Sequence, residues 1–360
     1  MANASKSERL SSLNRNAEGE TSMKAIKAAA VQAAPVYLNL DASIAKAAEI
    51  VSEAARNGAK LVAFPETWLP GYPFFVWLGA PVEGIRFIPQ YHANSVELHS
   101  SEMKRLQKIA AANEITLVMG YSEREGGSRY MSQVIIGEQG EILLNRRKLK
   151  PTHVERTVYG EGDGSDLRVV DAAFGRLGAL NCWEHMQPLL KMAMYSQFEE
   201  VHVAAWPTFS LYREMAYALG PEVNNGASRQ YAVEGSAYVL APCSIINQEV
   251  FDLLAATPEK GALLNPQTSK PGGGFAQIYG PDGRALCEPI PEDQEGILYA
   301  DLDPAMVAIA KAAADPAGHY SRADAARLVV NRERRCVMQE INVLTNSNFE
   351  VIPLEDDIAI

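Results

Sequence analysis

Cys182 stands where two patterns meet in the stretch GRLGALNCWEH. The apolar run from Leu177 to Leu180 predicts a buried strand, and the residues from Pro188 onward have apolar side chains at helical spacing. A side chain at such a junction is presented at the edge of a sheet, and a helix N-terminus behind it favours the thiolate form of a cysteine. The pattern therefore predicts a nucleophilic thiol, and a small buried hydrophobic residue is the alternative.

Three charged residues are predicted at similar strand ends. Glu66 follows the apolar strand expected at 60–64, Lys148 follows the alternating strand expected at 142–145, and Glu155 comes seven residues later. Each alone is compatible with a solvated surface position. Together with a thiol they supply a base, an electrostatic stabiliser and an orienting group, which is the set needed to attack an electrophilic carbon bonded to nitrogen.

Histidines leave a second kind of thiol chemistry open. His185 lies three residues after Cys182, and His153 and His202 are further candidates for a base in a Cys–His thiol hydrolase. A zinc site would need more ligands than Cys182 and His185, and no second pair stands nearby at ligand spacing. The glycine-rich stretches GEGDGSD and PGGGF lack the context of a dinucleotide site. We therefore expect no metal and no cofactor.

The elements that must position these residues alternate along the chain. Because strands, hairpins and intervening helices are mixed, a layered α/β sandwich is favoured over a simple doubly wound sheet. Strands are expected at 25–31, 60–64, 115–123, 177–180, 201–207, 236–243 and 296–303, helices at 40–57 and 101–113, and hairpins around Gln139-Gly140 and Asp282-Gly283.

Length and composition limit the organisation of the chain. Its 360 residues, 47% of them hydrophobic, can bury one large core, and no Pro/Gly/Ser-rich linker divides them. Residues 1–22 are polar and lack both periodicity and the apolar stretch of a signal peptide. We expect a disordered leader at 1–22, a catalytic domain at 23–304 and a C-terminal extension at 305–360 that is involved in oligomer contacts.

Charge and cysteine usage exclude several kinds of partner. A formal net charge of −11 argues against a nucleic-acid partner, which would require a basic face. No apolar window is long enough for a membrane helix. The four cysteines are widely spaced without a C-x-x-C pair, which favours a reducing compartment and a cytoplasmic location.

Four stretches of the chain resemble microbial nitrilases of the carbon–nitrogen hydrolase superfamily. They are AFPETWLPGYP around Glu66, NRRKLKPTHVERTVYGEGDGSDL around Lys148 and Glu155, LGALNCWEH around Cys182, and DPAGHYSRAD near the C-terminus. The similarity covers residues 25–331, with the three catalytic segments in the family's order. It implies a four-layer α-β-β-α sandwich of the carbon–nitrogen hydrolase type.

The resemblance also implies a reaction. A nitrile and water would give the carboxylic acid and ammonia through a thioimidate and a thioester on Cys182, with Glu66 as the base, Lys148 as the stabilising cation and Glu155 as its support. Further stretches, AAWPTFSLYREM, EVNNGASRQYAVEG and YVLAPCSI, are similar to arylacetonitrilases, which act on phenylacetonitrile or mandelonitrile. An aliphatic nitrilase, a cyanide-hydrating enzyme and an amidase of the same superfamily remain alternatives. A non-catalytic binding or filament protein is disfavoured by the complete catalytic set.

Seven residues near the predicted strand ends are candidates for binding the substrate or supporting the site. Aromatic and rigid side chains suit an apolar, ring-shaped substrate, although each can equally be a core residue. The candidates are Trp68, Tyr72, Trp183, His185, Trp206, Pro207 and Phe209.

Two apolar segments outside the predicted strands bear on assembly. Residues 73–91, with Trp77, and residues 250–264 are costly to leave in water. By resemblance, such insertions join dimers of microbial nitrilases into spirals or helical filaments, so we expect a homo-oligomer with a dimer as its building block. The alternative is that both segments fold back onto their own subunit.

Overall fold

The computed structural model describes residues 23–336 and 338, with the exception of 212, 214–215 and 266. The leader predicted at 1–22 and the last part of the predicted C-terminal extension lie outside the described residues. No helix in the described part of the chain combines the length and the apolar composition needed to cross a membrane.

Two mixed sheets form the centre of the molecule. The first sheet has the strand order β11-β1-β2-β3-β4-β5, and the second has the order β10-β9-β8-β7-β6. In the first sheet, β1 pairs in parallel with β2 and antiparallel with β11, and β2 pairs in parallel with β3. The strand bounds are β1 (Ile26–Gln32), β2 (Ala59–Ala63), β3 (Thr116–Glu125), β4 (Ser128–Ile136), β5 (Ile142–Arg147), β6 (Val169–Ala172), β7 (Gly175–Asn181), β8 (Val201–Ala205), β9 (Tyr238–Ala241), β10 (Gln277–Tyr279) and β11 (Gly296–Leu302).

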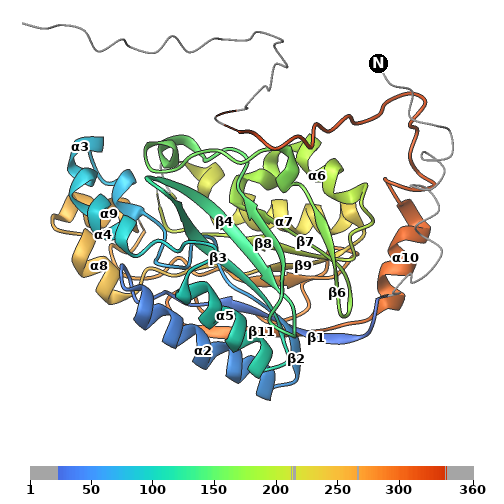
Figure 1. The fold of residues 1–360 in the computed structure, drawn as a ribbon, viewed down its shortest axis with the longest axis horizontal. Coiled ribbons are helices and arrows are strands. Elements are labelled where there is room, and N and C mark those ends of the chain that lie inside the picture. Colours follow the sequence, from blue (N-terminus) through green and yellow to red (C-terminus); the bar gives the residue numbers. More distant parts are fainter. Residues whose placement is uncertain (1–22, 212, 214–215, 266, 337, 339–360) are drawn as a thin grey trace, which may run out of the picture.

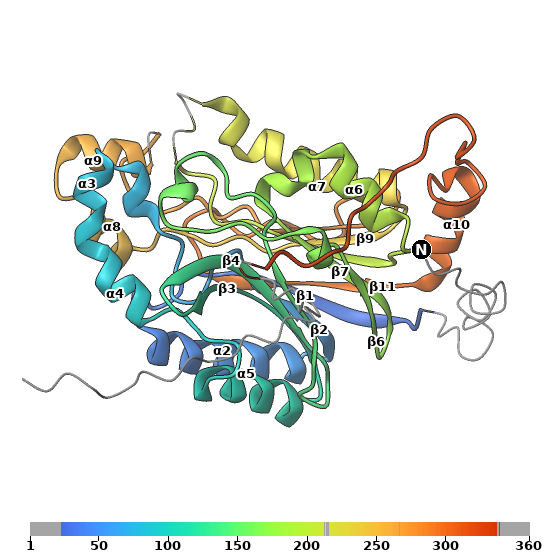
Figure 2. The same ribbon diagram turned by 45° about the horizontal axis from the view of Figure 1, so that its top comes forward.

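Helices cover the outer face of each sheet, so the layers run α-β-β-α (Figures 1 and 2). Helices α2 and α5 pack on the first sheet, and α6 and α7 pack on the second. The helix bounds are α2 (Leu40–Arg56), α3 (Pro81–Gly84), α4 (Ile88–Ala93), α5 (Ser101–Ala112), α6 (Pro188–Tyr195), α7 (Pro221–Gly235), α8 (Gln248–Leu254), α9 (Pro258–Leu264) and α10 (Pro304–Ala314). The predicted four-layer sandwich is confirmed.

The alternation of side chains along β1 explains how one strand serves two cores. Ala28 and Ala30 belong to the core between the sheets, whereas Ala29 and Val31 belong to the core under α2 and α5. Successive side chains of a strand point to opposite faces, and both faces of this strand are covered. A strand covered on both faces has no need for alternating polar side chains. Such strands therefore appear in the sequence as continuous apolar runs.

The expected elements are found within one to a few residues of their predicted ends. The hairpin around Gly140 joins β4 to β5, with Gly140 at φ 85°. The turn around Gly283 is also present, with φ 82°, but beyond β10 its second arm is reduced to an isolated bridge between Tyr279 and Ala285. Left-handed φ values of this kind favour glycine, and they explain the turn signals in the sequence.

The two apolar segments fold largely onto their own subunit. Phe74, Phe75, Leu78 and Leu254 are buried in a third core together with Tyr91. The argument that these side chains need a neighbouring subunit to leave water is therefore wrong for most of them. Three large apolar residues of these segments do remain exposed, namely Val82, Ile85 and Leu253.

Candidate active site

Glu66 lies between the two sheets, just beyond the end of β2. Its backbone N–H donates to the Trp206 carbonyl, 3.3 Å away beyond the end of β8, and its side chain is fully buried. The preceding Pro65 passes directly over Gly120 of β3, where a Cβ would overlap the Pro65 carbonyl oxygen. A glycine at position 120 therefore permits the close approach that places Glu66 at the site.

Lys148 connects two carboxylates. It follows β5 directly, and its Nζ donates to Glu66 Oε1 at 2.9 Å and to Glu155 Oε2 at 2.8 Å. All three side chains are buried. Burial opposes the charge of Lys148, but Glu155 and Glu66 outweigh that effect and raise the pKa of its amine well above the usual value. Lys148 is therefore a fixed cation at this site.

Glu155 is held by its own turn. It lies in the 3₁₀ helix η4 (His153–Thr157), where Thr152 N donates to Glu155 Oε2 at 2.6 Å in a capping box. Tyr72 donates from its hydroxyl to the other oxygen, Oε1, at 2.7 Å, and Trp77 Nε1 donates to that hydroxyl at 3.0 Å. Both oxygens of Glu155 are engaged, which fits an orienting role.

Cys182 begins the 3₁₀ helix η6 (Cys182–Met186) at the end of β7. Its φ of 44° lies in the left-handed region, a conformation that costs a residue other than glycine about 1–3 kcal/mol. Such strain is found at functional sites that the surrounding structure over-determines. The thiol is buried and lies in the electrostatic field of Glu66, Lys148 and Glu155, so the structure brings all four predicted catalytic residues together.

Glu184 ties the thiol turn to the lysine segment, and sequence reasoning missed this role. Its Oε2 accepts from Asn181 N at 2.8 Å, and its Oε1 accepts from Leu149 N at 3.0 Å and from Arg146 Nη2 at 2.7 Å. Arg146 in turn donates to Gln133 Oε1 at 2.8 Å. The backbone neighbours of Cys182 and Lys148 thus share one carboxylate, which sets the position of one sheet's catalytic residues against the other's.

One sequence signal could have identified Glu184. Asn181 and Glu184 stand at the first and fourth positions of an N-x-x-E pattern, as Thr152 and Glu155 do in T-x-x-E. Both patterns are capping boxes that begin a helical turn. Arg146 offers no comparable signal, because its partner belongs to the other half of the chain.

The protonation of the thiol differs from the sequence prediction. Burial, together with the negative charge of Glu66, raises the pKa of Cys182 well above its ordinary value, although Lys148 and a hydrogen bond from the Trp183 amide oppose the increase. The prediction that a helix N-terminus lowers this pKa is therefore wrong. Only the short η6 turn lies directly behind the thiol, and desolvation dominates. The resting thiol is protonated and needs a base.

Glu66 has the properties of that base. Burial raises its pKa to about 8, against the opposing charge of Lys148 and with a further increase from Glu155. Its Oε2 has no hydrogen-bond partner among the described residues. A carboxylate whose pKa lies near neutrality and which keeps one oxygen unpaired is suited to accept a proton.

No candidate histidine is placed as a base for the thiol. His185 Nδ1 lies 2.6 Å from the carbonyl oxygen of Cys182, which makes this nitrogen a donor to the backbone. Burial and the neighbouring His202 lower the pKa of His185 to about 3. His202 Nε2 lies 2.9 Å from His185 Nε2, and His153 stacks on Trp77. This arrangement argues against a Cys–His thiol hydrolase.

The predicted pocket residues divide into two groups. Trp68 is fully buried with Phe64 in the core under α2 and α5, and its Nε1 donates to the Ala33 carbonyl at 2.9 Å. Trp68 is therefore a core residue in this structure, and not the pocket residue that the sequence predicted. Residues that do lie beside the catalytic groups or in the core cluster that contains Cys182 are Tyr72, Trp183, His185, Trp206 and Phe209, and Pro207 follows Trp206 as a buried residue.

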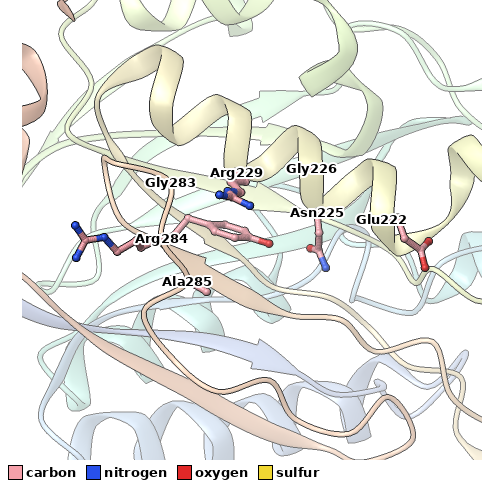
Figure 3. A pocket seen from close by; sticks show the side chains of 8 residues that line it. Glu222, Asn225, Gly226, Arg229, Gly283, Arg284 and Ala285 are labelled. Carbon is pink, nitrogen blue, oxygen red and sulfur yellow. The ribbon is translucent and has the colours of Figure 1, made fainter. Parts of the chain in front are cut away.

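A surface hollow of about 550 Å³ lies elsewhere, between α7 and the turn after β10 (Figure 3). It is lined by Glu222, Asn225 and Arg229 of the helix and by Arg284 of the turn, among others, and includes none of the predicted catalytic or pocket residues. Among the described residues, no group of three or more His, Cys, Asp or Glu side chains is arranged to hold a metal ion.

Comparisons with known proteins agree with this geometry. The family model described as "Carbon-nitrogen hydrolase" matches residues 27–312. The chain is 50% identical over 335 residues to "Nitrilase" of Pseudomonas syringae pv. syringae (93% of this chain, 98% of the relative) and 51% identical over 331 residues to "Aliphatic nitrilase" of Rhodococcus rhodochrous (91% and 85%). It is 48% identical over 319 residues to "Nitrilase, arylacetone-specific" of Alcaligenes faecalis (89% and 88%).

Solved structures support the fold. A carbon–nitrogen hydrolase from Helicobacter pylori superposes with a TM-score of 0.64 at 19% sequence identity, over 83% of this chain and 96% of that one. At this identity the likeness concerns the fold alone, and it agrees with the two stacked sheets and their outer helices. Since the family model matches most of the chain and relatives of about half-identical sequence match nearly its whole length, the chain belongs to the carbon–nitrogen hydrolase family.

Proposed function

We propose that this protein is a nitrilase, which hydrolyses a nitrile to the carboxylic acid and ammonia. One observation carries the proposal: Lys148 is bound between Glu66 and Glu155, and these three charges act on the buried thiol of Cys182. A protonated thiol beside a base and a fixed cation is suited to add to a polar carbon–nitrogen multiple bond. The names of the similar proteins, all nitrilases, favour a nitrile over an amide as the substrate.

The first half of the reaction forms the carbon–sulfur bond. Glu66 takes the thiol proton of Cys182 and passes it to the nitrile nitrogen as the sulfur adds to the nitrile carbon, which gives a thioimidate and restores the Glu66 carboxylate. Lys148 is the cation placed to stabilise negative charge that develops as the bond forms, and it acts most strongly because the site is buried. The backbone amide of Trp183, which follows Cys182 directly and lowers the pKa of its thiol, is a second donor close to the reacting atoms.

The second half consumes two water molecules. The first water, activated by Glu66, adds to the thioimidate carbon to give a tetrahedral intermediate, which expels ammonia and leaves a thioester. The second water attacks the thioester, and the carboxylic acid leaves as the carbon–sulfur bond breaks and the thiol is restored. Glu155 keeps Lys148 in place throughout, because Thr152 and Tyr72 hold both of its oxygens.

Arylacetonitriles such as phenylacetonitrile and mandelonitrile are the substrates that we propose. Aromatic residues stand close to the catalytic groups: the Tyr72 hydroxyl donates to Glu155, Trp183 follows Cys182, and the Trp206 backbone carbonyl accepts from Glu66 N. Such surroundings favour a ring-shaped apolar substrate. The similar proteins include both an arylacetone-specific and an aliphatic nitrilase, so the preference has to be measured.

Ammonia release tests both levels of the proposal. The panel contains phenylacetonitrile, mandelonitrile, benzonitrile, an aliphatic dinitrile and the matching amides, with the Cys182→Ala variant as the blank. We expect the first two nitriles to have the highest kcat/KM. A higher value for the dinitrile would overturn the arylacetonitrile preference, and a higher value for the amides would overturn the nitrilase assignment itself.

Assembly and location are proposed on separate grounds. We propose a dimer that extends into a spiral or filament through the exposed apolar residues Val82, Ile85 and Leu253, with the C-terminal extension 305–360 at a subunit contact. Sedimentation of the wild type and of the Ile85→Asp variant tests this, since a monomeric wild type would contradict it.

A cytoplasmic location is proposed because all four cysteines are free, and the exposed Cys336 persists best in a reducing compartment.

A further inference from the structure

Behind the nucleophile lies a buried row of titratable side chains that the reaction above does not use. Glu199 Oε1 lies 2.7 Å from His202 Nδ1, His202 Nε2 lies 2.9 Å from His185 Nε2, and His185 Nδ1 lies 2.6 Å from the Cys182 carbonyl oxygen. Tyr231 closes the far end by donating to Glu199 Oε2 at 2.6 Å. Glu199, His202 and His185 are at most 1% exposed. We refer to these three residues as the Glu199–His202–His185 relay.

The carbonyl at one end determines the direction of every hydrogen bond in the row. A carbonyl oxygen only accepts, so His185 Nδ1 carries a proton, and a neutral His185 then offers a lone pair at Nε2. His202 must therefore donate from its Nε2, and a neutral His202 offers a lone pair at Nδ1 to Glu199. The row is fully satisfied when Glu199 donates a proton to that lone pair.

We propose that Glu199 is a protonated positioning residue, which acts through His202 and His185 to hold the Cys182 carbonyl and so the orientation of the nucleophile. The inference rests on the proposed function for its meaning in catalysis, but the hydrogen-bond order is a property of the resting protein. Cys182 needs such a hold, because its φ of 44° is unfavourable for a residue with a side chain.

The surroundings of Glu199 support a neutral carboxyl. Its hydrogen-bond partners are a histidine and a tyrosine, and burial raises its pKa to about 8, with Lys311 of α10 opposing the increase through its charge. Burial also lowers the pKa of His202 well below its usual value, which places the shared proton on Glu199. The other charged or titratable groups that act on the row are Arg146, Glu184 and Tyr195.

Space for this carboxyl is provided by β7. A Cβ at Gly178 would overlap Glu199 Oε1 and lie within 2.8 Å of Met194 Cε. Gly178 stands four residues before Cys182 on the strand that ends at the nucleophile. Strand β7 thus leads directly to the nucleophile and, at Gly178, leaves the space that the Glu199 carboxyl occupies.

Three variants test the role of the proton at position 199. Glu199→Gln keeps a donor for His202 and an acceptor for Tyr231, so we expect kcat within about threefold of the wild type. Glu199→Leu removes the donor and leaves His202 Nδ1 buried without a partner, so the His202 ring is no longer held against His185, and we expect kcat to fall about 100-fold with a smaller change in KM. Tyr231→Phe is the matched control, because it keeps the ring that stacks on His202 and removes only a bond outside the row.

Nitrogen NMR of ¹⁵N-histidine-labelled wild type tests the proton order without turnover, so it stands even if no nitrile is hydrolysed. We expect His185 protonated at Nδ1 alone and His202 at Nε2 alone. A doubly protonated His202, equal losses in Glu199→Gln and Glu199→Leu, full activity in Glu199→Leu, or a 100-fold loss in Tyr231→Phe would each overturn the proposal. If Glu199→Leu does not fold, the spectra and the Glu199→Gln rate still decide it.

Discussion

Two rows of buried titratable side chains meet at Cys182, one from each sheet. Glu66, bonded to Lys148, ends the row from the first sheet, and Glu199, bonded to His202, ends the row from the second. Burial raises the pKa of both carboxyls to about 8. Their hydrogen bonds differ: Glu66 Oε2 has no partner among the described residues, whereas both oxygens of Glu199 are engaged.

This difference shows why a raised pKa alone does not assign a role. A carboxyl with one unpaired oxygen next to a thiol can exchange a proton with it, so Glu66 is suited to chemistry. A carboxyl whose two oxygens already bond to fixed partners is suited to hold its proton, so Glu199 is suited to positioning. Perturbed pKa values mark both functional and structural groups, and an oxygen without a hydrogen-bond partner distinguishes the functional carboxyl from the structural one.

Removing the thiol tests the point where the two rows meet. Cys182→Ala should abolish turnover while the protein stays folded, because the change removes one sulfur atom from a buried site. Mass spectrometry of the wild type, digested after treatment with a slow substrate, should find an acyl adduct on the peptide that contains Cys182. Cys243→Ala, at another buried free cysteine, is the matched control and should remain active. An adduct on Cys243 would refute the assignment.

Altering the charged row should cost nearly as much. Glu66→Gln removes the accepting oxygen and Lys148→Met removes the cation, and each should lower kcat about 100-fold or more, or about 2.7 kcal/mol in the activation free energy. Because the two groups act as one unit, the double variant should be little worse than either single variant. Steady-state kinetics checks this. Strictly additive losses, or a Glu66→Gln rate as high as that expected of Glu199→Gln, would remove the distinction between the rows.

The carboxylate that joins the two sheets should matter through position. Glu184→Gln weakens the buried pair with Arg146 and should lower the free energy of unfolding by about 3 kcal/mol, since breaking a buried ion pair leaves its partner charge uncompensated. We also expect kcat per folded molecule to fall about tenfold, because residues 149 and 181 lose a shared anchor. Urea unfolding and kinetics measure the two effects.

Glu123→Gln provides the control for that experiment. Glu123 pairs with Arg147, the strand neighbour of Arg146, and is also buried, but its hydrogen-bond partners Ser132, Asn145 and Arg147 are not catalytic residues. Its loss should destabilise the protein without changing kcat per folded molecule. Equal kinetic losses in the two variants would show that Glu184 contributes only stability.

The smallest of these effects is the pH dependence of kcat/KM, which should fall on the acid side of the profile. Glu66 must be ionised to accept the thiol proton, so kcat/KM should fall as the pH drops through the Glu66 pKa. That pKa is raised by burial from 4.5 to about 8, so the limb should lie far above the ordinary carboxyl range. A profile on mandelonitrile from pH 5 to 10 measures it. An acid limb near pH 4.5 would contradict the buried environment of the base.

Much of the site could be predicted because its residues follow strands. The apolar runs before Glu66 and Cys182 are strands covered on both faces, so their pattern is strong and their ends are well defined. The alternation of elements also indicated a layered α/β sandwich, whereas the four-layer order was implied by the resemblance to carbon–nitrogen hydrolases. Both predictions depend on local sequence, which the fold preserves.

The remainder depended on contacts between distant segments. Arg146 meets Glu184 from the other sheet, and Glu199 fits beside Gly178, and neither contact leaves a local pattern. The thiol pKa was misjudged for the same reason, because desolvation by the packed sheets outweighs the short turn behind Cys182. Trp68 likewise stands next to the Glu66 segment in sequence but belongs to a different core.

The pairing of β1 with β11 has a consequence for synthesis. β1 contains residues 26–32 and is near the start of the described chain, yet one of its two neighbours is residues 296–302. During translation, β1 therefore has an unpaired edge until almost the whole chain has left the ribosome, and such edges invite pairing with other chains. Contacts at this sequence separation also slow folding. The first sheet thus depends on β11, the last strand of the described residues, to pair with β1, and nascent chains that end before residue 296 should be protease-sensitive and prone to aggregate.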